Sequence, residues 1–337
     1  MSRIILKEIG PVSESVQLEP HPDLTLGPAD VLVEMEAAGI NLTDFRLAEG
    51  TYTERVRPSL PSAMGTEGVG RVIAAGTTAD PSLVGRRVVF LPNYLQGTWA
   101  DRTVAPASSV IPVGEKADAQ QLALLAVNPA TAYGLLNRYA TLGPGDWIGQ
   151  DMGNSAVGRN VIALAHHAGV RTLSVVRREE TVKQLLDQGA DLVVVGGAGK
   201  DDVDGLRDRI ADALGDTTFR LVFDGVGGPV AGALAHSLEF GGQVISYSSL
   251  THTPVAVPAA DLVYRELGVR GYWLINWIRT APRAEIEAVY TELAELVEQG
   301  VLHTPVEETF ALADYRAAFD RARKPQREGK ILFHFGA

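Results

Sequence analysis

The residues with the clearest chemical potential lie in the stretch GQDMGNSAVGRNVIALAHHAGVRTLSVVRREE, which runs from Gly149 to Glu180. Gly153, Ala156 and Gly158 stand where an apolar strand turns into a helix. Small residues at such a turn let backbone N–H groups approach a pyrophosphate, and the start of the helix adds partial positive charge. The spacing is a degenerate form of G-x-G-x-x-G, which alone would be a weak signal for a nucleotide site. Its place in a run of alternating strands and helices strengthens the prediction.

The turn therefore predicts a dinucleotide site. We expect the cofactor to contact it at Asn154, Ser155, Val157 and Gly158. The glycine-containing segment DGVGG (224–228), with Gly225, and the segment SYSS (246–249), with Tyr247, each follow a predicted strand. Ligands of parallel sheets bind at such strand ends, so we expect both segments to line the cofactor.

The end of the second strand of this unit indicates which nucleotide binds. A carboxylate there, ~20 residues after the turn, would bind the ribose 2′-hydroxyl of NAD. Arg177 and Arg178 occupy that place instead. Guanidinium groups suit a 2′-phosphate through bidentate, charge-assisted hydrogen bonds, which predicts NADPH. The alternative is that both arginines only pair with Glu179 and Glu180 on a solvated helix start.

Other common catalytic signatures do not occur. The chain has no Gly-x-Ser-x-Gly, no H-E-x-x-H and no Walker loop. It also contains no cysteine, which excludes disulfides, a thiol nucleophile and every cysteine-ligated zinc site. His166 and His167 are adjacent on a predicted helix, where neighbouring side chains point apart, so we interpret them as structural.

Composition narrows the class of partner. The 337 residues carry a net charge of −11 and no long basic run, so we expect neither nucleic acid nor an anionic membrane as a partner. No apolar run reaches the ~18 residues that span a bilayer, and the first residues do not resemble a secretory signal. Together with the absence of cysteine, these features predict a cytoplasmic protein with a small-molecule substrate.

The elements that position these residues divide the chain into two halves. The first ~120 residues are rich in glycine and proline, and residues 30–40, 67–76 and 86–92 read as short strands, which predicts an irregular β barrel. Residues 118–140 have helical spacing, with Pro129 as the expected break or kink.

The second half alternates strands with helices. Strands are expected at 146–150, 171–176, 191–195, 219–226 and 241–248, and helices at 156–169, 179–189, 201–215 and 229–238. Such alternation predicts a parallel sheet covered on both faces. Helices near 283–299 and 313–323 and a strand at 330–335 return the chain to the first half. The predicted fold class is α/β, with one discontinuous domain at 1–122 and 290–337 and a doubly wound Rossmann domain at 123–289.

The segments NLTDFRLAEGTY (41–52), MGTEGVGRV (64–72) and NPATAYGLL (128–136), together with the dinucleotide turn, resemble the zinc-free branch of the medium-chain dehydrogenase/reductase superfamily. That branch includes quinone oxidoreductases, and the resemblance covers essentially the whole chain. It implies a GroES-like irregular β-barrel catalytic domain beside the Rossmann domain. Zinc-dependent members have a metal-ligating histidine in a G-H-E segment, where this chain has Thr66 before Glu67, so no metal is expected.

Four segments support a narrower resemblance. The segments NSAVG (154–158), SVVRREE (174–180), LQGTWADRTV (95–104) and LGVRGYWLINW (267–277) resemble the mitochondrial-type trans-2-enoyl thioester reductases. Asp151 and Gly153 depart from that family, where asparagine and alanine are expected. The resemblance implies a homodimer that uses NADPH to reduce the C2–C3 double bond of enoyl-CoA or enoyl-ACP, with hydride added to Cβ and a proton to Cα.

The resemblance also implies roles for individual residues. Tyr52 matches the tyrosine that donates or orients the proton, although it could instead be a turn tyrosine that packs beside the cleft. Asn41 and Asp44 could orient a ligand amide, or they could be a helix N-cap and its partner. Thr131 is expected near the nicotinamide, with a helix-capping hydroxyl as the alternative.

Three of the four tryptophans, Trp99, Trp273 and Trp277, suit the wall of an acyl or quinone pocket. Trp99 and Trp273 are the better candidates by resemblance, and core packing or a subunit contact is the alternative for each. Two other functions stay open. One is an NADPH:quinone or enone reductase on the same scaffold. The other is a nucleotide-binding sensor or structural protein without turnover.

Overall fold

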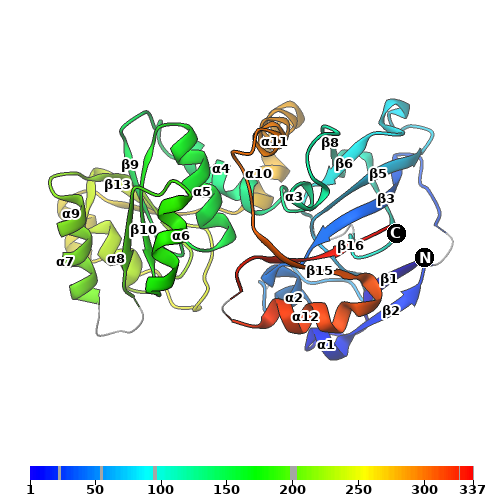
Figure 1. Ribbon diagram of the computed structural model, residues 1–337, viewed down its shortest axis with the longest axis horizontal. Helices are drawn as coiled ribbons and strands as arrows, with labels where there is room; N and C mark the ends of the chain where they lie inside the picture. Colours follow the sequence, from blue (N-terminus) through cyan, green and yellow to red (C-terminus); the bar gives the residue numbers. More distant parts are fainter. Residues whose placement is uncertain (22–23, 54–55, 94–96, 198–202, 326, 337) are drawn as a thin grey trace. The chain divides into compact units, whose positions relative to one another are not determined.

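The chain leaves its first structural unit after Val127 and returns to it at Trp277 in the computed structural model (Figure 1). The first unit comprises residues 1–127 and 277–337, and the second comprises residues 128–276. The structure describes residues 1–21, 24–53, 56–93, 97–197, 203–325 and 327–336. The domain limits expected from the sequence, 122 and 290, differ from this division. A cut at 290 would fall inside helix α11 (Arg283–Glu298), which lies whole in the first unit.

The first unit is built on a sheet of seven strands in the order β15-β16-β3-β5-β6-β8, with β7 also paired to β3. Their bounds are β3 Asp30–Gly39, β5 Gly68–Ala75, β6 Arg87–Phe90, β7 Arg102–Pro106, β8 Val110–Pro112, β15 Val306–Ala311 and β16 Lys330–His334. The long strand β3 has antiparallel neighbours in β5, β7 and β16. The C-terminal strand β16 therefore completes a sheet that begins near the N-terminus, as the sequence predicts.

A second, smaller sheet and several helices complete this unit. The small sheet has the order β2-β1-β4, with β1 Ser2–Leu6, β2 Val16–Pro20 and β4 Ser62–Ala63. The α-helices are α1 Val12–Ser15, α2 Leu42–Ala48, α3 Ala119–Ala123, α11 Arg283–Glu298 and α12 Tyr315–Arg323, and the short 3-10 helices are η1 Pro81–Leu83, η2 Ala107–Ser109 and η5 Leu312–Asp314. Helix α10 (Leu274–Thr280) spans the point where the chain returns.

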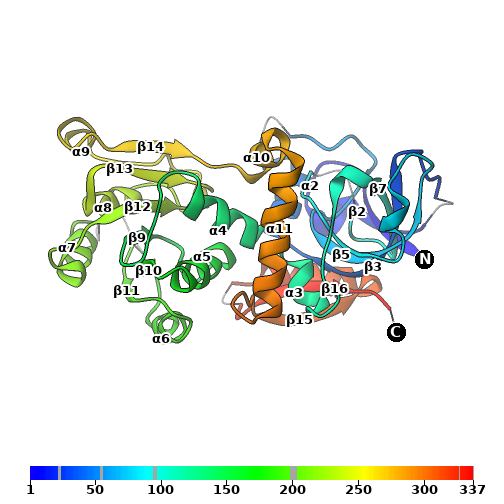
Figure 2. The ribbon, with the colours of Figure 1, turned by 90° about the horizontal axis from the view of Figure 1, so that it is seen from above.

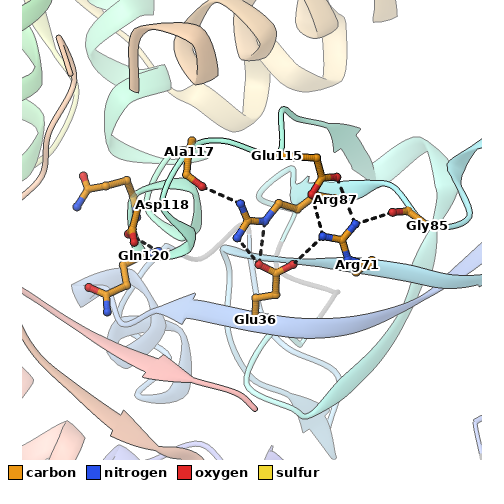
Figure 3. Close-up of polar contacts among 9 residues, drawn as sticks. Glu36, Arg71, Gly85, Arg87, Glu115, Ala117, Asp118 and Gln120 are labelled. Atoms are coloured by element: carbon orange, nitrogen blue, oxygen red, sulfur yellow. Dashed lines mark hydrogen bonds and ion pairs between the residues drawn. The ribbon is translucent and has the colours of Figure 1, made fainter. Parts of the chain in front are cut away.

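A network of ion pairs and hydrogen bonds connects strands β3, β5 and β6 of this unit (Figure 3). Arg71 and Arg87 stand directly opposite each other on β5 and β6, an arrangement that is unfavourable for two like charges. Glu36 of β3 offsets it, because its Oε2 accepts from Arg87 Nε at 2.8 Å. Arg71 Nη2 donates to Glu115 Oε2 at 2.8 Å, and Arg87 Nη1 donates to the Ala117 carbonyl at 2.7 Å. The network thus anchors the segment that leads into α3.

The second unit contains a six-stranded sheet in the order β11-β10-β9-β12-β13-β14, and every pairing in it is parallel. The strands are β9 Trp147–Gln150, β10 Arg171–Val176, β11 Leu192–Val195, β12 Phe219–Asp224, β13 Leu238–Ser246 and β14 Gly268–Gly271. The strand order reverses direction between β9 and β12, which is where open α/β sheets bind ligands. The predicted doubly wound parallel sheet is confirmed.

Helices cover both faces of this sheet, with α7 and α8 on one side and α4 and α5 on the other (Figure 2). The bounds are α4 Asn128–Asn137, α5 Ala156–His167, η3 Glu179–Thr181, α6 Val182–Asp187, α7 Val203–Leu214, α8 Val230–Ala235 and α9 Ala259–Tyr264. Among the described residues, no helix combines the length and the apolar character needed to cross a bilayer.

The helical stretch expected at 118–140 is two helices, α3 and α4. The interruption lies at residues 124–127, ahead of the predicted break at Pro129, which is the second residue of α4. Proline lacks the N–H that the first turn of a helix would leave unpaired in any case, and its fixed φ suits that turn. Pro129 therefore begins a helix here instead of breaking one.

Candidate functional site

The turn between β9 and α5 is held in shape by its own small residues. Ser155 is the N-cap of α5, and its Oγ accepts a hydrogen bond from Gly158 N at 3.0 Å. A Cβ on Gly158 would lie 2.5 Å from the Met152 carbonyl oxygen, and one on Gly153 would lie 2.6 Å from Ser174 Cβ. Both glycines are thus required by close approach. The turn presents a helix N-terminus beside small residues, an arrangement suited to a pyrophosphate.

A buried glutamine fixes this turn to the sheet. Gln150, 1 % exposed at the end of β9, donates through Nε2 to the Gly158 carbonyl at 3.1 Å and to Ser174 Oγ at 2.9 Å. These bonds join β9, α5 and β10, so the N-terminus of α5 is held in a fixed position over the strand ends. The sequence analysis did not identify Gln150, because a single polar residue at a strand end carries no distinctive pattern.

Gly225 and Tyr247, both predicted to line the cofactor, follow the neighbouring strands β12 and β13 and lie close together. A Cβ on Gly225 would lie 2.7 Å from the Tyr247 hydroxyl and 3.0 Å from Met152 Sδ. Met152 has φ of 50°, a left-handed conformation that costs energy for a residue with a side chain. The backbone is therefore held tightly at the end of β9, next to the segment that follows β12.

Arg177 and Arg178 follow β10 directly. Arg177 is exposed, and Arg178 Nη1 lies 3.5 Å from Glu180 Oε1. The ion pair that the sequence analysis considered as an alternative thus exists for Arg178. Exposed pairs of this kind contribute at most about 1 kcal/mol, so the pair leaves the guanidinium available to a phosphate.

Thr131 and Trp273, the two other residues expected at the cofactor, also belong to the second unit. Thr131 is buried within α4, three residues after the helix begins. Trp273 is half-buried between β14 and α10, and its carbonyl accepts from Asn276 N at 3.0 Å. Their contact with a cofactor stays a prediction.

Asn41 and Asp44 form a helix cap in the first unit, which is the alternative weighed from the sequence. Asn41 is the N-cap of α2, and its backbone N donates to Asp44 Oδ2 at 2.8 Å. The side chain of Asn41 is also engaged: Nδ2 donates to Glu67 Oε1 at 2.7 Å, and Oδ1 accepts from Lys330 Nζ. Asn41 is therefore held as a structural link, and we do not retain it as a residue that acts on substrate.

Tyr52 lies just beyond the end of α2. Its backbone N donates to the Arg46 carbonyl at 3.1 Å, and its side chain is half-buried. The cap at Asn41 and Asp44 fixes the start of the helix from which Tyr52 follows. The proton-transfer role of Tyr52 stays a prediction.

A buried charged cluster lies around the Asn41 side chain. Asp44 and Glu67 have no exposed surface, and Glu67 Oε2 accepts from Val127 N at 3.0 Å. Burial raises the pKa of Asp44 to about 7, an effect opposed by hydrogen bonding to Asn41 and Thr66. Burial also raises the pKa of Glu67 and lowers that of Lys330, and the two opposite charges partly offset both shifts.

Lys330 was not predicted from the sequence, because it lies far from Asn41 along the chain. The antiparallel pairing of Leu332 with Gly39 brings the two residues together. No sequence motif signals this contact. Thr66, at the place of the zinc-ligating histidine, is buried beside the cluster. Within the described ranges, no group of three or more metal-ligating side chains comes together.

Trp99 requires a correction. Its side chain has no exposed surface and packs on Phe319 and Phe333, with ring centroids 5.1 and 5.5 Å away. Nε1 donates to the Gly39 carbonyl at 3.0 Å. Trp99 is thus a core residue, which is the alternative stated from the sequence, because an indole buried on all sides cannot line a substrate pocket. The expectation that Trp99 takes part in the catalytic site as a pocket wall is therefore wrong.

An irregular β barrel joined to a doubly wound sheet with a small-residue dinucleotide turn defines the class of two-domain, nucleotide-dependent oxidoreductases. Comparison with known proteins agrees. Residues 27–115 match the alcohol dehydrogenase GroES-like domain family, and residues 156–295 match the zinc-binding dehydrogenase family. The enoyl-[acyl-carrier-protein] reductase, mitochondrial, of Rattus norvegicus is 32% identical, over 94% of this chain and 84% of its own.

The chain belongs to the medium-chain dehydrogenase/reductase superfamily, within the group that contains the mitochondrial enoyl reductases. Two solved structures share its fold over 99% of both chains. They are a putative NADPH:quinone reductase from Bacillus thuringiensis, with a TM-score of 0.88 and 25% identity, and the Etr1p/NADP/crotonyl-CoA complex, with a TM-score of 0.82 and 21% identity. The GroES-like and Rossmann architecture inferred from the sequence is confirmed.

Because the pKa of Asp44 is raised in the folded state, the free energy of unfolding should decrease as pH rises. The folded state keeps a proton on Asp44 up to about pH 7, whereas the unfolded state loses it near the ordinary aspartate pKa of 3.8. The free energy of unfolding therefore falls as pH rises between these values. We expect the free energy of unfolding of the wild type to fall by about 2–3 kcal/mol relative to that of Asp44→Asn between pH 5 and 8. Urea titrations at several pH values measure it. Asp320→Asn, at an exposed position, should run parallel to the wild type, and a parallel course for Asp44→Asn would contradict the assignment.

Proposed function

We propose that the protein is an NADPH-dependent, zinc-independent reductase of the C2–C3 double bond in 2-enoyl thioesters of coenzyme A or acyl carrier protein. The observation that carries the proposal is the 32% identity with a mitochondrial enoyl-[acyl-carrier-protein] reductase, which extends over 94% of the chain. The Etr1p/NADP/crotonyl-CoA complex shares the fold of this chain, so the fold is compatible with the proposal.

The second unit fits the proposed cofactor. The turn at Asn154, Ser155, Val157 and Gly158 supplies backbone N–H groups and a helix N-terminus for the pyrophosphate. Arg177 and Arg178 stand where NAD-specific proteins place a carboxylate, and they would bind the 2′-phosphate. Gly225, Tyr247, Thr131 and Trp273 would line the rest of the bound molecule. When bound, NADPH supplies the hydride that adds to Cβ.

The first unit would supply the proton. Tyr52 follows the end of α2, and a phenol hydroxyl is a suitable proton donor toward a strongly basic enolate carbon. In the proposal, Tyr52 donates to Cα or orients the group that does. Hydrogen bonds to the thioester oxygen would stabilise the enolate charge that develops during reduction.

The second candidate is an NADPH:quinone or enone reductase. The observation that favours it is the TM-score of 0.88 to a putative NADPH:quinone reductase. The two activities share a scaffold and a cofactor site, so fold cannot separate them. A nucleotide-binding protein without turnover is a weaker candidate, because the chain keeps both Tyr52 and a dinucleotide turn.

We also propose a cytoplasmic homodimer. Strand β14 is an edge of the parallel sheet, and Val269 on it is 44 % exposed. An open edge with an apolar side chain suits pairing with a second copy of the chain. The absence of cysteine supports a reducing compartment, although the relatives are named as mitochondrial proteins. The net charge of −11 argues against nucleic acid or an anionic membrane as a partner.

The substrate class is tested by NADPH oxidation with crotonyl-CoA, a longer enoyl-CoA and an ortho-quinone, followed by absorbance. We expect saturable turnover of both thioesters and at least ~10-fold lower kcat/KM with the quinone, because specificity is differential binding of transition states. Rapid quinone turnover with inert thioesters would support the second candidate. Tight NADPH binding without oxidation by any acceptor would support the sensor.

The arginines are tested by Arg177→Ala combined with Arg178→Ala. We expect the Kd of NADPH to rise about 10–100-fold, because charge-assisted bonds to the 2′-phosphate are lost, while that of NADH changes little. Fluorescence titration of both nucleotides measures it. A matched control removes two arginines from α7 of the same unit, Arg207→Ala with Arg209→Ala. Equal losses for both nucleotides would exclude the assignment to the 2′-phosphate.

Tyr52→Phe removes one hydroxyl and keeps the ring. We expect kcat to fall about 10²–10³-fold with the preferred thioester, because general acid catalysis contributes at this level. The Kd of NADPH should stay within about twofold, since Tyr52 and the dinucleotide turn belong to different units. Tyr264→Phe, at a side chain that is 80 % exposed, is the control. Wild-type turnover in Tyr52→Phe would remove this residue from the mechanism.

A further inference from the structure

Two buried carboxyl groups meet beneath the dinucleotide turn. Asp151 follows β9 and is 1 % exposed, and Asp224 ends β12 and has no exposed surface. The pairing of Gln150 with Phe223 sets the two aspartates side by side, and Asp151 N donates to the Phe223 carbonyl at 3.1 Å. Two ionised carboxylates in such a place would repel each other strongly.

The hydrogen bonds account for three of the four carboxyl oxygens. Asp151 Oδ1 accepts from Gly225 N at 2.7 Å, and its Oδ2 faces Val226 N at 3.4 Å. Asp224 Oδ1 accepts from Gly227 N at 2.9 Å. Asp224 Oδ2 is buried and has no hydrogen-bond donor among the described residues. A buried acceptor without a donor costs about 1–3 kcal/mol, so the structure calls for a proton at this point.

The surroundings favour a proton on Asp151. Burial raises its pKa well above the ordinary value, and the neighbouring charge of Asp224 and a side-chain hydrogen bond to it raise the pKa further. The backbone N–H groups of Gly225 and Val226 oppose the shift. In the described part of the chain, no arginine, lysine or histidine forms an ion pair with either carboxyl.

Among the residues that the structure describes, the other titratable group that faces the pair is Tyr247, which follows β13. Its hydroxyl is buried, and burial together with the charges of Asp151 and Asp224 raises its pKa. Tyr247 therefore stays a neutral phenol and supplies no positive charge that could balance two ionised aspartates. A proton shared between the carboxyls is the neutralising device that the described residues provide.

We propose that Asp151 is a protonated positioning residue of the cofactor site, which donates its proton to Asp224 Oδ2 and holds residues 225–228 against the dinucleotide turn. This inference rests on the proposed NADPH site in the second unit. The protonated form joins the ends of β9 and β12, so Gly225 and Tyr247 keep their places. Loss of the proton would put two negative charges beneath the turn that is to bind a pyrophosphate, which weakens NADPH binding.

Asp151→Asn is the matched variant, because its amide Nδ2 can donate to Asp224 Oδ2 while its oxygen still accepts from Gly225 N. Asp151→Leu has a similar volume but cannot donate or accept. At neutral pH we expect the Asn variant to bind NADPH within about threefold of the wild type. We expect the Leu variant to bind about tenfold more weakly or worse, since it leaves buried polar groups unpaired. Wild-type affinity in a folded Leu variant would overturn the positioning role.

Protonation is tested by infrared spectroscopy of the wild type and Asp151→Asn at neutral pH, which needs no cofactor. In the wild type, the carbonyl stretch of protonated carboxylic acids should include a contribution from Asp151. This contribution should be lost in Asp151→Asn and kept in Asp224→Glu, whereas Asp44→Asn should remove only the separate contribution of Asp44, whose pKa is also raised. A spectrum of Asp151→Asn identical to that of the wild type in this region would overturn the proposal, even if the Leu variant does not fold.

The two measurements are joined by a pH titration. The infrared contribution of Asp151 is the part of the band that is present in the wild type and absent in Asp151→Asn. Through the pH range in which this contribution disappears, the Kd of NADPH for the wild type should rise by up to about tenfold per pH unit relative to that for Asp151→Asn. A constant ratio of the two Kd values through that range would contradict the coupling. If the wild type does not bind NADPH at any pH, the proposed function fails, and the infrared comparison still decides the state of Asp151.

Discussion

The parallel pairing of β9 with β12 is the contact on which the cofactor unit depends. It joins strands that are far apart in the sequence, and it creates the point at which the strand order reverses. The turn that begins α5 and the glycine-containing segment after Asp224 then lie at the same edge of the sheet. The proposed pyrophosphate turn and the carboxyl pair both depend on that adjacency.

Buried polar groups explain how both units keep their shape near their strand ends. A polar group removed from water must find a partner or lose free energy, so each buried one constrains its neighbours. Gln150 meets this need by joining the Gly158 carbonyl to Ser174. Asn41 meets it by joining Glu67 to Lys330.

The need of buried polar groups for hydrogen-bond partners also distinguishes structural residues from the residues proposed to bind the cofactor. Asn41 and Trp99 have their hydrogen-bonding groups engaged inside the first unit, and each is accounted for by folding. Arg177 is exposed after β10, and Arg178 forms a surface ion pair with Glu180. Groups that remain accessible can bind a ligand without breaking the fold, which is why the arginines stay in the proposed cofactor site.

The architecture and the type of cofactor turn could be predicted from the order of residues along the chain. Strand and helix periodicity, the glycines at 153 and 158, and the return of residues 330–335 to the first unit are local patterns or direct consequences of chain order. The predicted parallel sheet and the family are both confirmed. Local patterns also located the start of α5, because a capping serine and small residues act within a few positions of each other.

Partners that are far apart in the sequence could be identified only from the folded chain. Lys330 meets Asn41 because β16 pairs with β3, and Asp151 meets Asp224 because β9 pairs with β12. It also placed Trp99 in the core, although its sequence segment resembles a pocket wall. Burial and pKa depend on neighbours that folding brings from elsewhere in the chain. A residue type alone therefore cannot tell a core indole from a binding one, or a protonated carboxyl from a charged one.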